Sequence, residues 1–401
     1  MLDAYIYDGL RSPFGRHAGK LAGVRPDELA AEVIAAVVRK SGVKPGDISD
    51  VLLGDVNQAG EDCRNVARFA ALLAGLPPTT PGATVNRLCA SGLQATLDAA
   101  RAVTCGEGQL YIAGGVESMS RAPYVMAKSE SAYSRDVKMF DTTIGARFTN
   151  PRFAKQFGNH SMPETGDNVA KDFSIPRVQA DEFALASQQK YVNAESAGFY
   201  KGEIHPIALP TKKKDVPPVM VEVDEHPRRD TTMESLAKLK PLFEGGVVTA
   251  GNASGVNDGA AALVIGSRQW GENNGKKPMV RILSGASAAV EPRIMGVGPA
   301  FAIPLACERA GLKLSDLDII EINEAFASQV LACLTLLKID FKDARVNPNG
   351  GAIAIGHPLG ASGARLALTV ARQLERMNGR YAAVSLCIGV GQGLAIIIER
   401  V

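Results

Sequence analysis

Apolar and polar positions along the 401-residue chain follow two periods, which predict strands and helices in alternation. Short apolar runs, several of them β-branched, predict strands at residues 1–9, 51–53, 110–113, 319–322 and 395–398. Amphipathic stretches separate them. The clearest spans residues 27–40, with acids in its first turn, bases in its last, and Gly42 after its end. This alternation is typical of an α/β fold built from layers.

Two patterns occur twice in the chain. Residues 41–48 are similar to residues 310–317, and each segment follows a helical stretch and precedes a strand. Residues 83–86 are similar to residues 344–347 at nearly the same offset. The repetition predicts two halves of similar topology that pack together, so that a site between them would draw groups from both.

Composition divides the chain further. A stretch rich in Pro, Arg, Lys and polar residues interrupts the first half, and it contains one clear predicted helix at about residues 181–197. We expect a first half formed by residues 1–120 and 247–275, an inserted loop domain at 121–246, and a second half at 276–401. The length of the chain is ample for such a division.

Charge and hydropathy exclude several classes of protein. The formal net charge is +2, from 44 basic and 42 acidic residues, and it gives no field suited to nucleic acid or an anionic membrane. The sequence shows no apolar stretch of bilayer length and no signal-peptide pattern, so a cytoplasmic location is expected. The one dense basic run, Lys212–Lys214, predicts a solvated loop that could contact a phosphate.

The thiols are the candidate reactive groups. Six cysteines lack CxxC spacing, which predicts free thiols rather than disulfides or structural zinc. Five histidines without a clustered pair give no metal motif. The sequence also lacks the G-x-S-x-G, P-loop and H-E-x-x-H motifs, which removes the usual cases for a serine hydrolase, a nucleotidase and a zinc protease.

Cys89 lies in Asn86-Arg87-Leu88-Cys89-Ala90-Ser91-Gly92, between a strand-like run and the small and apolar residues of a buried helix. A bend from strand to helix would project the thiol outward, and the helix N-terminus would favour its thiolate form. On position alone, a small buried hydrophobe is the alternative, because free cysteines are commonly interior.

Cys387 ends an apolar run and opens Cys387-Ile388-Gly389-Val390-Gly391. The spacing is weakly similar to a dinucleotide-binding loop, but such a loop should open a helix, whereas residues 396–398 predict a second strand. The glycines therefore predict a tight hairpin that presents the thiol and backbone N–H groups to a ligand.

His357 lies in a loop, residues 347–363, that is too rich in glycine and too apolar for a solvated connector. Between Gly356 and Pro358, in a loop of small residues, the imidazole is not needed for packing. This favours a catalytic role over the structural role of most lone histidines. Ser362 could cap the following helix, which should run to about residue 377.

Asn323 follows a predicted strand, and its amide could face a polarised carbonyl, as oxyanion stabilisers do. Capping of a helix that starts at Ala325 is the plainer alternative. Both could hold, because a cap uses only the side-chain oxygen.

Taken together, these motifs resemble those of the thiolase family. The similar segments occur in the family's order over nearly the whole chain: 86–92, 251–259 with Asn-Ala-Ser-Gly at 252–255, 323–327, 356–358 and 387–391. The resemblance implies the thiolase fold, a five-layered α/β/α/β/α arrangement of two similar halves with a loop domain inserted in the first. It also implies an acyltransferase that uses coenzyme A (CoA) as co-substrate and holds no permanent cofactor.

The resemblance also implies roles for the candidate residues. Cys89 would attack a 3-oxoacyl-CoA to form an acyl-enzyme while His357 takes the thiol proton. Cys387 would protonate the departing acetyl-CoA carbanion, and free CoA would then remove the acyl group. His357 and a water on Asn323 would hold the enolate oxygen, and the backbone N–H groups of Cys89 and Gly389 the acyl oxygen.

Positions that match the family's CoA contacts come from three parts of the chain. Arg228 and Ser235 lie in the inserted domain, and Ser254 lies in the segment that returns to the first half. The pantetheine tunnel would be lined by Met162, Ala325 and Phe326.

Three further segments, at 56–62, 141–145 and 161–165, are similar to thiolases that cleave 3-oxoadipyl-CoA in the β-ketoadipate pathway of aromatic-compound catabolism. The products would be succinyl-CoA and acetyl-CoA. The distal carboxylate needs a donor, and three residues are candidates by type, with an exposed ion pair as the alternative for each: Arg147, Arg152 and His160.

Other possibilities remain open at the level of sequence. A short-chain acetoacetyl-CoA thiolase is the first alternative. A non-catalytic thiolase-like CoA-binding protein is the second, against which the intact Cys89, His357 and Cys387 speak. Residues 122–148 are similar to the loop that joins some thiolase dimers into tetramers, so a homotetramer is expected.

Overall fold

The structure, a computed structural model, describes residues 1–211 and 217–401. The basic run Lys212–Lys214 lies outside the described residues. In the described part, ten strands form one mixed sheet. They are β1 (Ala4–Arg11), β2 (Gly15–Arg16), β3 (Asp50–Gly54), β4 (Gly82–Val85), β5 (Leu110–Ser118), β10 (Asn257–Gly266), β11 (Val280–Ala289), β12 (Ile319–Ile322), β13 (Tyr381–Ile388) and β14 (Gln392–Arg400). All five predicted strand segments overlap strands of this sheet.

The sheet consists of two halves with matching strand order. The first half runs β4-β3-β5-β10-β1 and the second β12-β13-β14-β11, and antiparallel pairing of β1 with β11 joins them. In both halves the inner two pairings are antiparallel and the outer pairing of β3 with β5, or β12 with β13, is parallel. In the second half, the counterpart of the β3–β4 pairing is a single parallel bridge between Ile320 and Val346. This topology agrees with the internal repeat, while the predicted domain boundaries stay a prediction.

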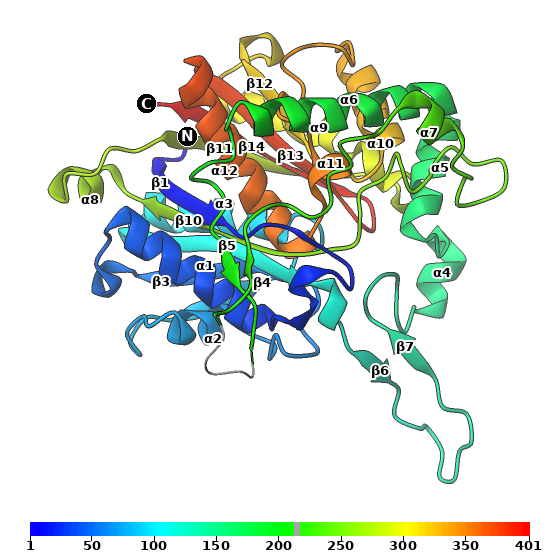
Figure 1. The fold of residues 1–401 in the computed structure, drawn as a ribbon, viewed down its shortest axis with the longest axis horizontal. Helices are drawn as coiled ribbons and strands as arrows, with labels where there is room; N and C mark the ends of the chain where they lie inside the picture. Colours follow the sequence, from blue (N-terminus) through cyan, green and yellow to red (C-terminus); the bar gives the residue numbers. More distant parts are fainter. Residues whose placement is uncertain (212–216) are drawn as a thin grey trace.

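Helices form three layers around the two half-sheets (Figure 1). The outer helices on the first half are α1 (Pro26–Ser41) and α2 (Val66–Leu73), and those on the second are α9 (Gly298–Ala310) and α10 (Ala327–Leu337). Between the half-sheets lie α3 (Ser91–Cys105) and α12 (Leu359–Met377). The predicted helix at 27–40 is confirmed as α1, and Gly42 ends it with a φ of 64°.

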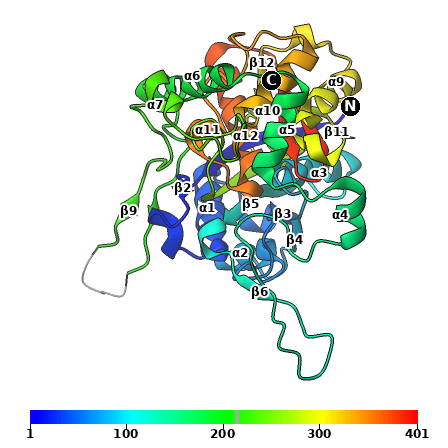
Figure 2. The same ribbon diagram turned by 90° about the vertical axis from the view of Figure 1, so that its right-hand side faces the viewer.

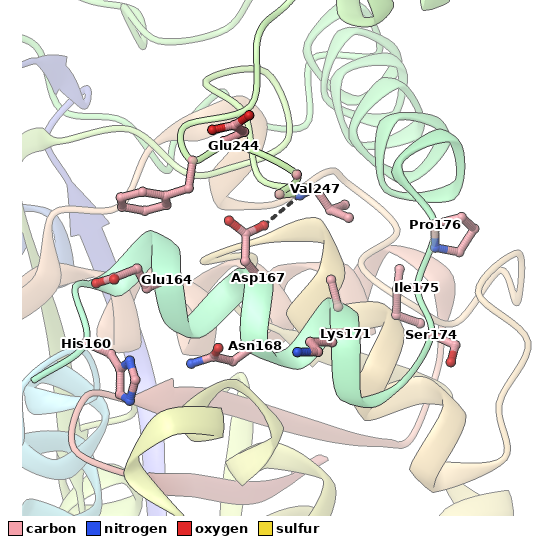
Figure 3. A pocket seen from close by; sticks show the side chains of 14 residues that line it. His160, Glu164, Asp167, Asn168, Lys171, Ser174, Ile175, Pro176, Glu244 and Val247 are labelled. Atoms are coloured by element: carbon pink, nitrogen blue, oxygen red, sulfur yellow. Dashed lines mark hydrogen bonds between the residues drawn. The ribbon is translucent and has the colours of Figure 1, made fainter. Parts of the chain in front are cut away.

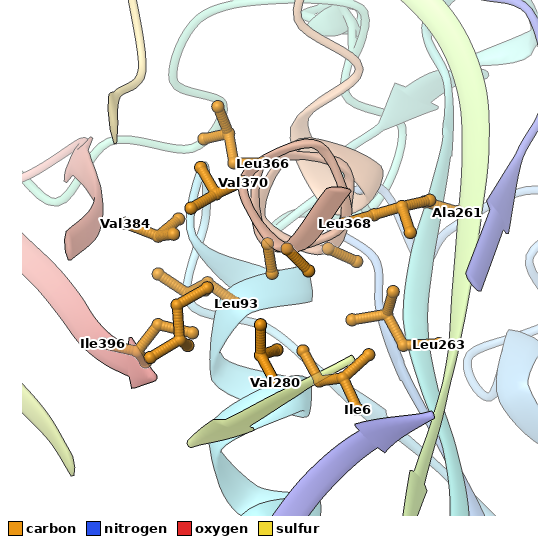
Figure 4. Packing of buried hydrophobic residues seen from close by; sticks show 14 of the residues in the cluster. Ile6, Leu93, Ala261, Leu263, Val280, Leu366, Leu368, Val370, Val384 and Ile396 are labelled. Atoms are coloured by element: carbon orange, nitrogen blue, oxygen red, sulfur yellow. The ribbon is translucent and has the colours of Figure 1, made fainter. Parts of the chain in front are cut away.

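The central layer contains the largest apolar cluster. Figure 4 shows Val384 and Ile396 of the second half on one side of α12, and Ala261 and Leu263 of the first half on the other. Burial of each Val, Leu or Ile side chain in this cluster contributes about 1.5–3 kcal/mol to stability. Because α3 and α12 are covered on both faces, the turns that precede them are held rigidly between the halves.

The inserted region is more structured than predicted. The predicted helix at 181–197 is confirmed as α6 (Arg177–Ser196), which begins four residues earlier. The region also contains helices that were not predicted: α4 (Pro151–Phe157), α5 (Met162–Asp172) and α7 (Met233–Ala237). The start of α5 carries a capping box formed by Ser161 and Glu164. Two short helices, α8 (Arg268–Asn273) and α11 (Ala352–Ile355), and a small hairpin of β8 (Ile207–Ala208) with β9 (Met220–Val221) lie elsewhere in the structure.

An arm formed by β6 (Tyr124–Met126) and β7 (Met139–Asp141) projects from the body of the molecule (Figures 1 and 2). The two strands pair antiparallel with each other and with no other described strand. Among the described residues, none of the helices combines the length and apolar character needed to cross a membrane.

Candidate active site

Cys89 lies in the bend between β4 and α3, as the sequence predicts. Leu88 adopts the left-handed conformation with a φ of 46°, which costs a non-glycine residue about 1–3 kcal/mol. Two side chains hold this bend: Asn86 Oδ1 accepts the Leu88 N–H at 2.9 Å, and Ser91 Oγ accepts the Arg87 N–H at 2.9 Å. The thiol is half-buried, so it can still be reached from solvent.

The predicted thiolate form of Cys89 was wrong. Burial raises the pKa of Cys89 to about 11, and hydrogen bonding to the Gly389 backbone opposes this only in part. The α3 helix begins at Ser91 with Ala90 as its N-cap, so the thiol precedes the first helical turn. Loss of water therefore outweighs the field of the helix end, and a base is needed to remove the thiol proton at neutral pH.

The predicted glycine hairpin is confirmed between β13 and β14. Its three connecting residues are 389–391, of which Val390 and Gly391 have φ values of 65° and 86°. A methyl group on Gly389 would lie 3.2 Å from Leu88 Cδ1 and 3.9 Å from Met162 Sδ. The hairpin of the second half thus touches both the Cys89 bend and the start of α5.

Cys387 is fully buried beneath this hairpin. Burial raises the pKa of Cys387 well above its usual range, and the nearby Cys89 sulfur raises it further. A thiol in this environment keeps its proton until a strongly basic atom approaches, which suits a proton donor to a carbanion.

His357 is held in one tautomer. Its Nδ1 lies 2.7 Å from Ser362 Oγ, which itself donates to the Pro358 carbonyl at 2.8 Å. Because a hydroxyl has one proton, Ser362 must accept from Nδ1–H, which leaves the lone pair on Nε2. Burial, with a contribution from Arg365, lowers the pKa of His357 to about 3. The imidazole is therefore neutral, with Nε2 as its basic atom.

The two capping predictions near this site were wrong. The α12 helix begins at Leu359, so Ser362 lies inside its first turn and binds His357 rather than capping the helix; the predicted end near residue 377 is confirmed. The α10 helix begins at Ala327, too late for capping by Asn323. Instead Asn323 Nδ2 lies 3.3 Å from His357 Nε2, and its buried Oδ1 has no hydrogen-bond partner among the described residues.

Close helix packing brings the two halves of the site together. A methyl group at Gly92 of α3 would overlap the carbonyl oxygen of Gly360 in α12, so the helices cross backbone to backbone. Cys89 directly precedes one of these helices and His357 the other. Gly356, with a φ of 108°, allows the turn that leads into His357.

Four of the six predicted CoA-contact residues lie near the hairpin at residues 389–391. Ser254 N–H donates to the Ala325 carbonyl at 2.9 Å, and Phe326 forms a bridge with Ala253. Ala325 and Phe326 belong to the same apolar cluster as Cys387. Met162 is the fourth, through its approach to the hairpin.

The other two, Arg228 and Ser235, line a cavity of about 190 Å³ that also contacts Gly251, close to Ser254. Ser235 Oγ is already engaged, since it accepts the Thr232 N–H at 3.0 Å and donates to the Thr232 carbonyl at 2.8 Å. Sequence reasoning missed the other polar residues on this wall, which are Gln188, His226, Asp230 and Thr231. The His-Pro-Arg run that places His226 two residues before Arg228 was a readable signal.

The three candidates for carboxylate recognition differ in environment. His160 lines a larger hollow of about 650 Å³ beside α5, where Glu164 and Asp167 face Glu244 and Val247 (Figure 3). Cys89, His357 and Cys387 do not line it. Arg152 and His160 are exposed and Arg147 is half-buried, and none of the three forms an ion pair with a described residue.

The site therefore combines a protonated thiol bonded to the Gly389 backbone, a neutral imidazole and a second buried thiol, which are groups suited to acyl transfer through a thioester. In residues 1–211 and 217–401, no group of three or more His, Cys, Asp or Glu could hold a metal ion. Family models for the thiolase N-terminal domain and the thiolase C-terminal domain match residues 4–269 and 276–400. The chain belongs to the thiolase family, and it is an acyltransferase whose substrates are CoA and acyl-CoA.

Individual relatives show which thiolases the chain is similar to. The chain is 56% identical over 403 residues to a β-ketoadipyl-CoA thiolase of Escherichia coli, with 100% of both chains covered. Its structure is similar to the Bacillus anthracis acetyl-CoA acetyltransferase, with a TM-score of 0.93, 38% identity, and 100% and 99% of the two chains covered. Human mitochondrial 3-ketoacyl-CoA thiolase in complex with CoA gives a TM-score of 0.91, 37% identity, and coverage of 100% and 98%. These likenesses confirm the predicted fold.

Proposed function

We propose that this enzyme cleaves 3-oxoadipyl-CoA with CoA to give succinyl-CoA and acetyl-CoA. The observation that carries the proposal is its 56% identity, over the full length of both chains, to a β-ketoadipyl-CoA thiolase. The arrangement of the two thiols, the imidazole and the glycine hairpin supports thiolysis as the chemistry.

In the first half-reaction, His357 Nε2 takes the proton of Cys89, and the sulfur bonds to C3 of the substrate. The C2–C3 bond then breaks, and its electron pair passes to C2 as the enolate of acetyl-CoA. Cys387 gives its proton to C2 and is left as a thiolate. The succinyl group stays on Cys89 as a thioester while acetyl-CoA departs.

In the second half-reaction, the thiol of free CoA gives its proton to Cys387, and the CoA sulfur attacks the succinyl carbonyl. The Cys89 sulfur leaves with the electron pair of the thioester bond and recovers its proton from His357. The sequence of steps is ping-pong, because the first product leaves before CoA reacts.

Two groups of donors would stabilise the developing negative charges. The backbone N–H groups of Gly389 and Cys89 face the acyl oxygen on the Cys89 side. His357 and the amide of Asn323 serve the enolate oxygen, and the free Oδ1 of Asn323 leaves an acceptor for a bound water. The six predicted CoA contacts would hold the co-substrate: Met162, Arg228, Ser235, Ser254, Ala325 and Phe326.

Arg147 is the favoured candidate to bind the distal carboxylate of the substrate. Among the three candidates it alone is half-buried, and its one side-chain hydrogen bond to a described residue is a long one, 3.4 Å, to the Gly145 carbonyl. Its charge is not neutralised by a described carboxylate within ion-pair distance. A charge-assisted hydrogen bond to the substrate would contribute about 1.5–3 kcal/mol.

The substrate proposal predicts a preference in kcat/KM. Thiolysis of 3-oxoadipyl-CoA should exceed that of acetoacetyl-CoA by about 10- to 100-fold, because only the former offers a carboxylate to the acyl site. Loss of the Mg²⁺-enolate absorbance measures both substrates. Arg147→Met should remove most of this ratio through the dicarboxylic substrate alone.

Arg152→Met is the matched control, since Arg152 is exposed on the neighbouring helix, and it should leave the ratio unchanged. Comparable rates on both substrates in the wild type would favour the short-chain thiolase instead. No activity on either would favour the non-catalytic CoA-binding protein.

A homotetramer in the cytoplasm is the proposed assembly and location. The edge strand β4 and the adjacent apolar face of α2, with exposed Phe69, Leu72 and Leu73, would pair two chains through their first halves. The projecting arm exposes a further apolar set that a second dimer would cover: Tyr124, Met126, Tyr133, Val137 and Met139.

Light scattering should accordingly give the mass of four chains. Shortening the arm between Met126 and Met139 should convert the tetramer into an active dimer, because the arm lies away from the catalytic hairpin. A wild-type mass of two chains would reject the tetramer.

A further inference from the structure

Glu117 is a buried carboxylate that the proposed reaction steps leave unused. It lies near the end of β5 and is only 1% exposed. Its Oε1 accepts the Asn57 N–H at 3.1 Å, while its Oε2 accepts the Val56 N–H at 3.2 Å and the Gly360 N–H at 3.0 Å. One carboxylate oxygen therefore joins the loop after β3 to the start of α12.

The bond to Gly360 acts on the turn that carries His357. Gly360 is the second residue of α12, and N–H groups in the first turn have no acceptor within their own helix. A carboxylate at this helix end is favoured by the helix dipole. Gly360 is also tightly enclosed, because a methyl group at Gly115 of β5 would overlap its carbonyl group.

The bond to Val56 acts on the bend that carries Cys89. The Val56 carbonyl accepts from Asn86 Nδ2 at 3.2 Å, and Asn86 Oδ1 in turn accepts the Leu88 N–H at 2.9 Å. An unbroken series of hydrogen bonds thus runs from Gly360 through Glu117, Val56 and Asn86 to the residue before Cys89.

We propose that Glu117 is a positioning residue for the thiolase reaction, whose carboxylate sets the separation of the Cys89 thiol and the His357 imidazole by tying their two turns together. The inference rests on the roles proposed for Cys89 and His357. Glu117 itself does not touch the reacting atoms.

The acidic neighbours of Glu117 indicate where the negative charge lies. Asp55 and Asp62, from the loop after β3, face Glu117. Both oxygens of Asp55 lack hydrogen-bond partners among the described residues, and burial, with the charge of Glu117, raises the pKa of Asp55 well above its usual range. Burial raises the pKa of Glu117 itself to about 7, while its three N–H donors oppose this rise. Glu117 is therefore the better site for the charge, and this charge adds to the effect of burial on the pKa of Cys89.

Glu117→Gln tests the proposal, because the amide keeps the size of the side chain but loses one of the two accepting oxygens. We expect kcat for thiolysis to fall on the order of 10- to 100-fold, since small misplacement of reacting groups has effects of this size. KM for CoA should change by less than about twofold, as the CoA contacts lie elsewhere. Alkylation of Cys89 by iodoacetamide should become faster at about pH 8, where Glu117 with its pKa of about 7 is mostly ionised, because removal of this charge lowers the pKa of Cys89.

Asp258→Asn is the matched control. Asp258 is a buried carboxylate at the start of the neighbouring strand β10. Its two oxygens accept from the Ser120 N–H at 2.9 Å and the Ser120 hydroxyl at 2.5 Å, and among the described residues its side chain has no hydrogen bond to either turn. The kcat of the Asp258→Asn variant should stay within about twofold of the wild-type value. Peptide mapping of the alkylated protein reports folding, since buried Cys307 and Cys333 should remain unlabelled.

An unchanged kcat in folded Glu117→Gln would overturn the proposal, as would a fall that appears only in KM. If Cys307 and Cys333 become labelled, Glu117→Asp decides instead: it keeps the charge but shortens the reach, so kcat should fall while Cys89 alkylation stays at the wild-type rate. Wild-type activity in Glu117→Asp would then overturn the proposal. If the wild-type enzyme never carries an acyl group on Cys89, the proposed function itself is contradicted, and not only the role of Glu117.

Discussion

Cys89→Ala should abolish acyl-enzyme formation and lower kcat/KM by at least about 10⁴-fold. The reason is geometric: the half-buried Cys89 sulfur meets the Gly389 backbone and lies near the Cys387 thiol. Mass spectrometry of the intact protein after mixing with acyl-CoA substrate measures the acyl group directly, and thiolysis kinetics measure the rate.

Cys105→Ala is the control, because Cys105 is an exposed thiol at the far end of the same helix. It should form the adduct and turn over as the wild type does. An acyl group that persists on the protein after Cys89 is removed would contradict the assignment of the nucleophile.

His357→Ala should lower kcat by about 10²- to 10⁴-fold near neutral pH, since general-base catalysis contributes this much. The pH dependence should also change. Since the pKa of Cys89 is raised to about 11 by burial, its thiolate fraction rises about tenfold per pH unit up to that value. The variant's rate of Cys89 alkylation should follow this rise. In the wild type, His357 stays neutral above its lowered pKa of about 3, so the base is present throughout the neutral range.

Alkylation of Cys89 by iodoacetamide between about pH 6 and pH 10 makes the comparison. His205→Ala is the matched control, since His205 contacts Glu32 far from the site in sequence and fold, and its profile should equal that of the wild type. A His357→Ala profile identical to the wild type would show that another group activates the thiol.

The order of the motifs was sufficient to predict the fold, and it supplied the residues that we propose for the site. Glycines at 389 and 391 predict the hairpin because they separate two apolar runs. The repeat of 41–48 at 310–317 predicts the two matching halves. Both signals are local, so they can be read from the sequence without knowledge of packing.

Features that depend on packing between the halves were not readable. The pKa of Cys89 is set by burial between α3, the hairpin and surrounding loops, which come from distant parts of the chain. Ser362 looked like a helix cap because the start of α12 within the glycine-rich loop could not be located. Glu117 reads as part of a buried strand, and its partners at 56–57 and 360 are found only in the folded protein.

The short helices of the inserted region were missed for a different reason. They are brief and polar, so hydrophobic periodicity gives little signal. Their starts were nevertheless marked, by Asn150 before Pro151 and by Ser161 with Glu164. Capping chemistry was therefore the better guide in this part of the chain.

The most direct test of the account is the mass of the protein after mixing with 3-oxoadipyl-CoA in the absence of free CoA. The proposed mechanism predicts one succinyl group per chain, located on the Cys89 peptide and released when CoA is added. No adduct, or an acyl group on another residue, would contradict it.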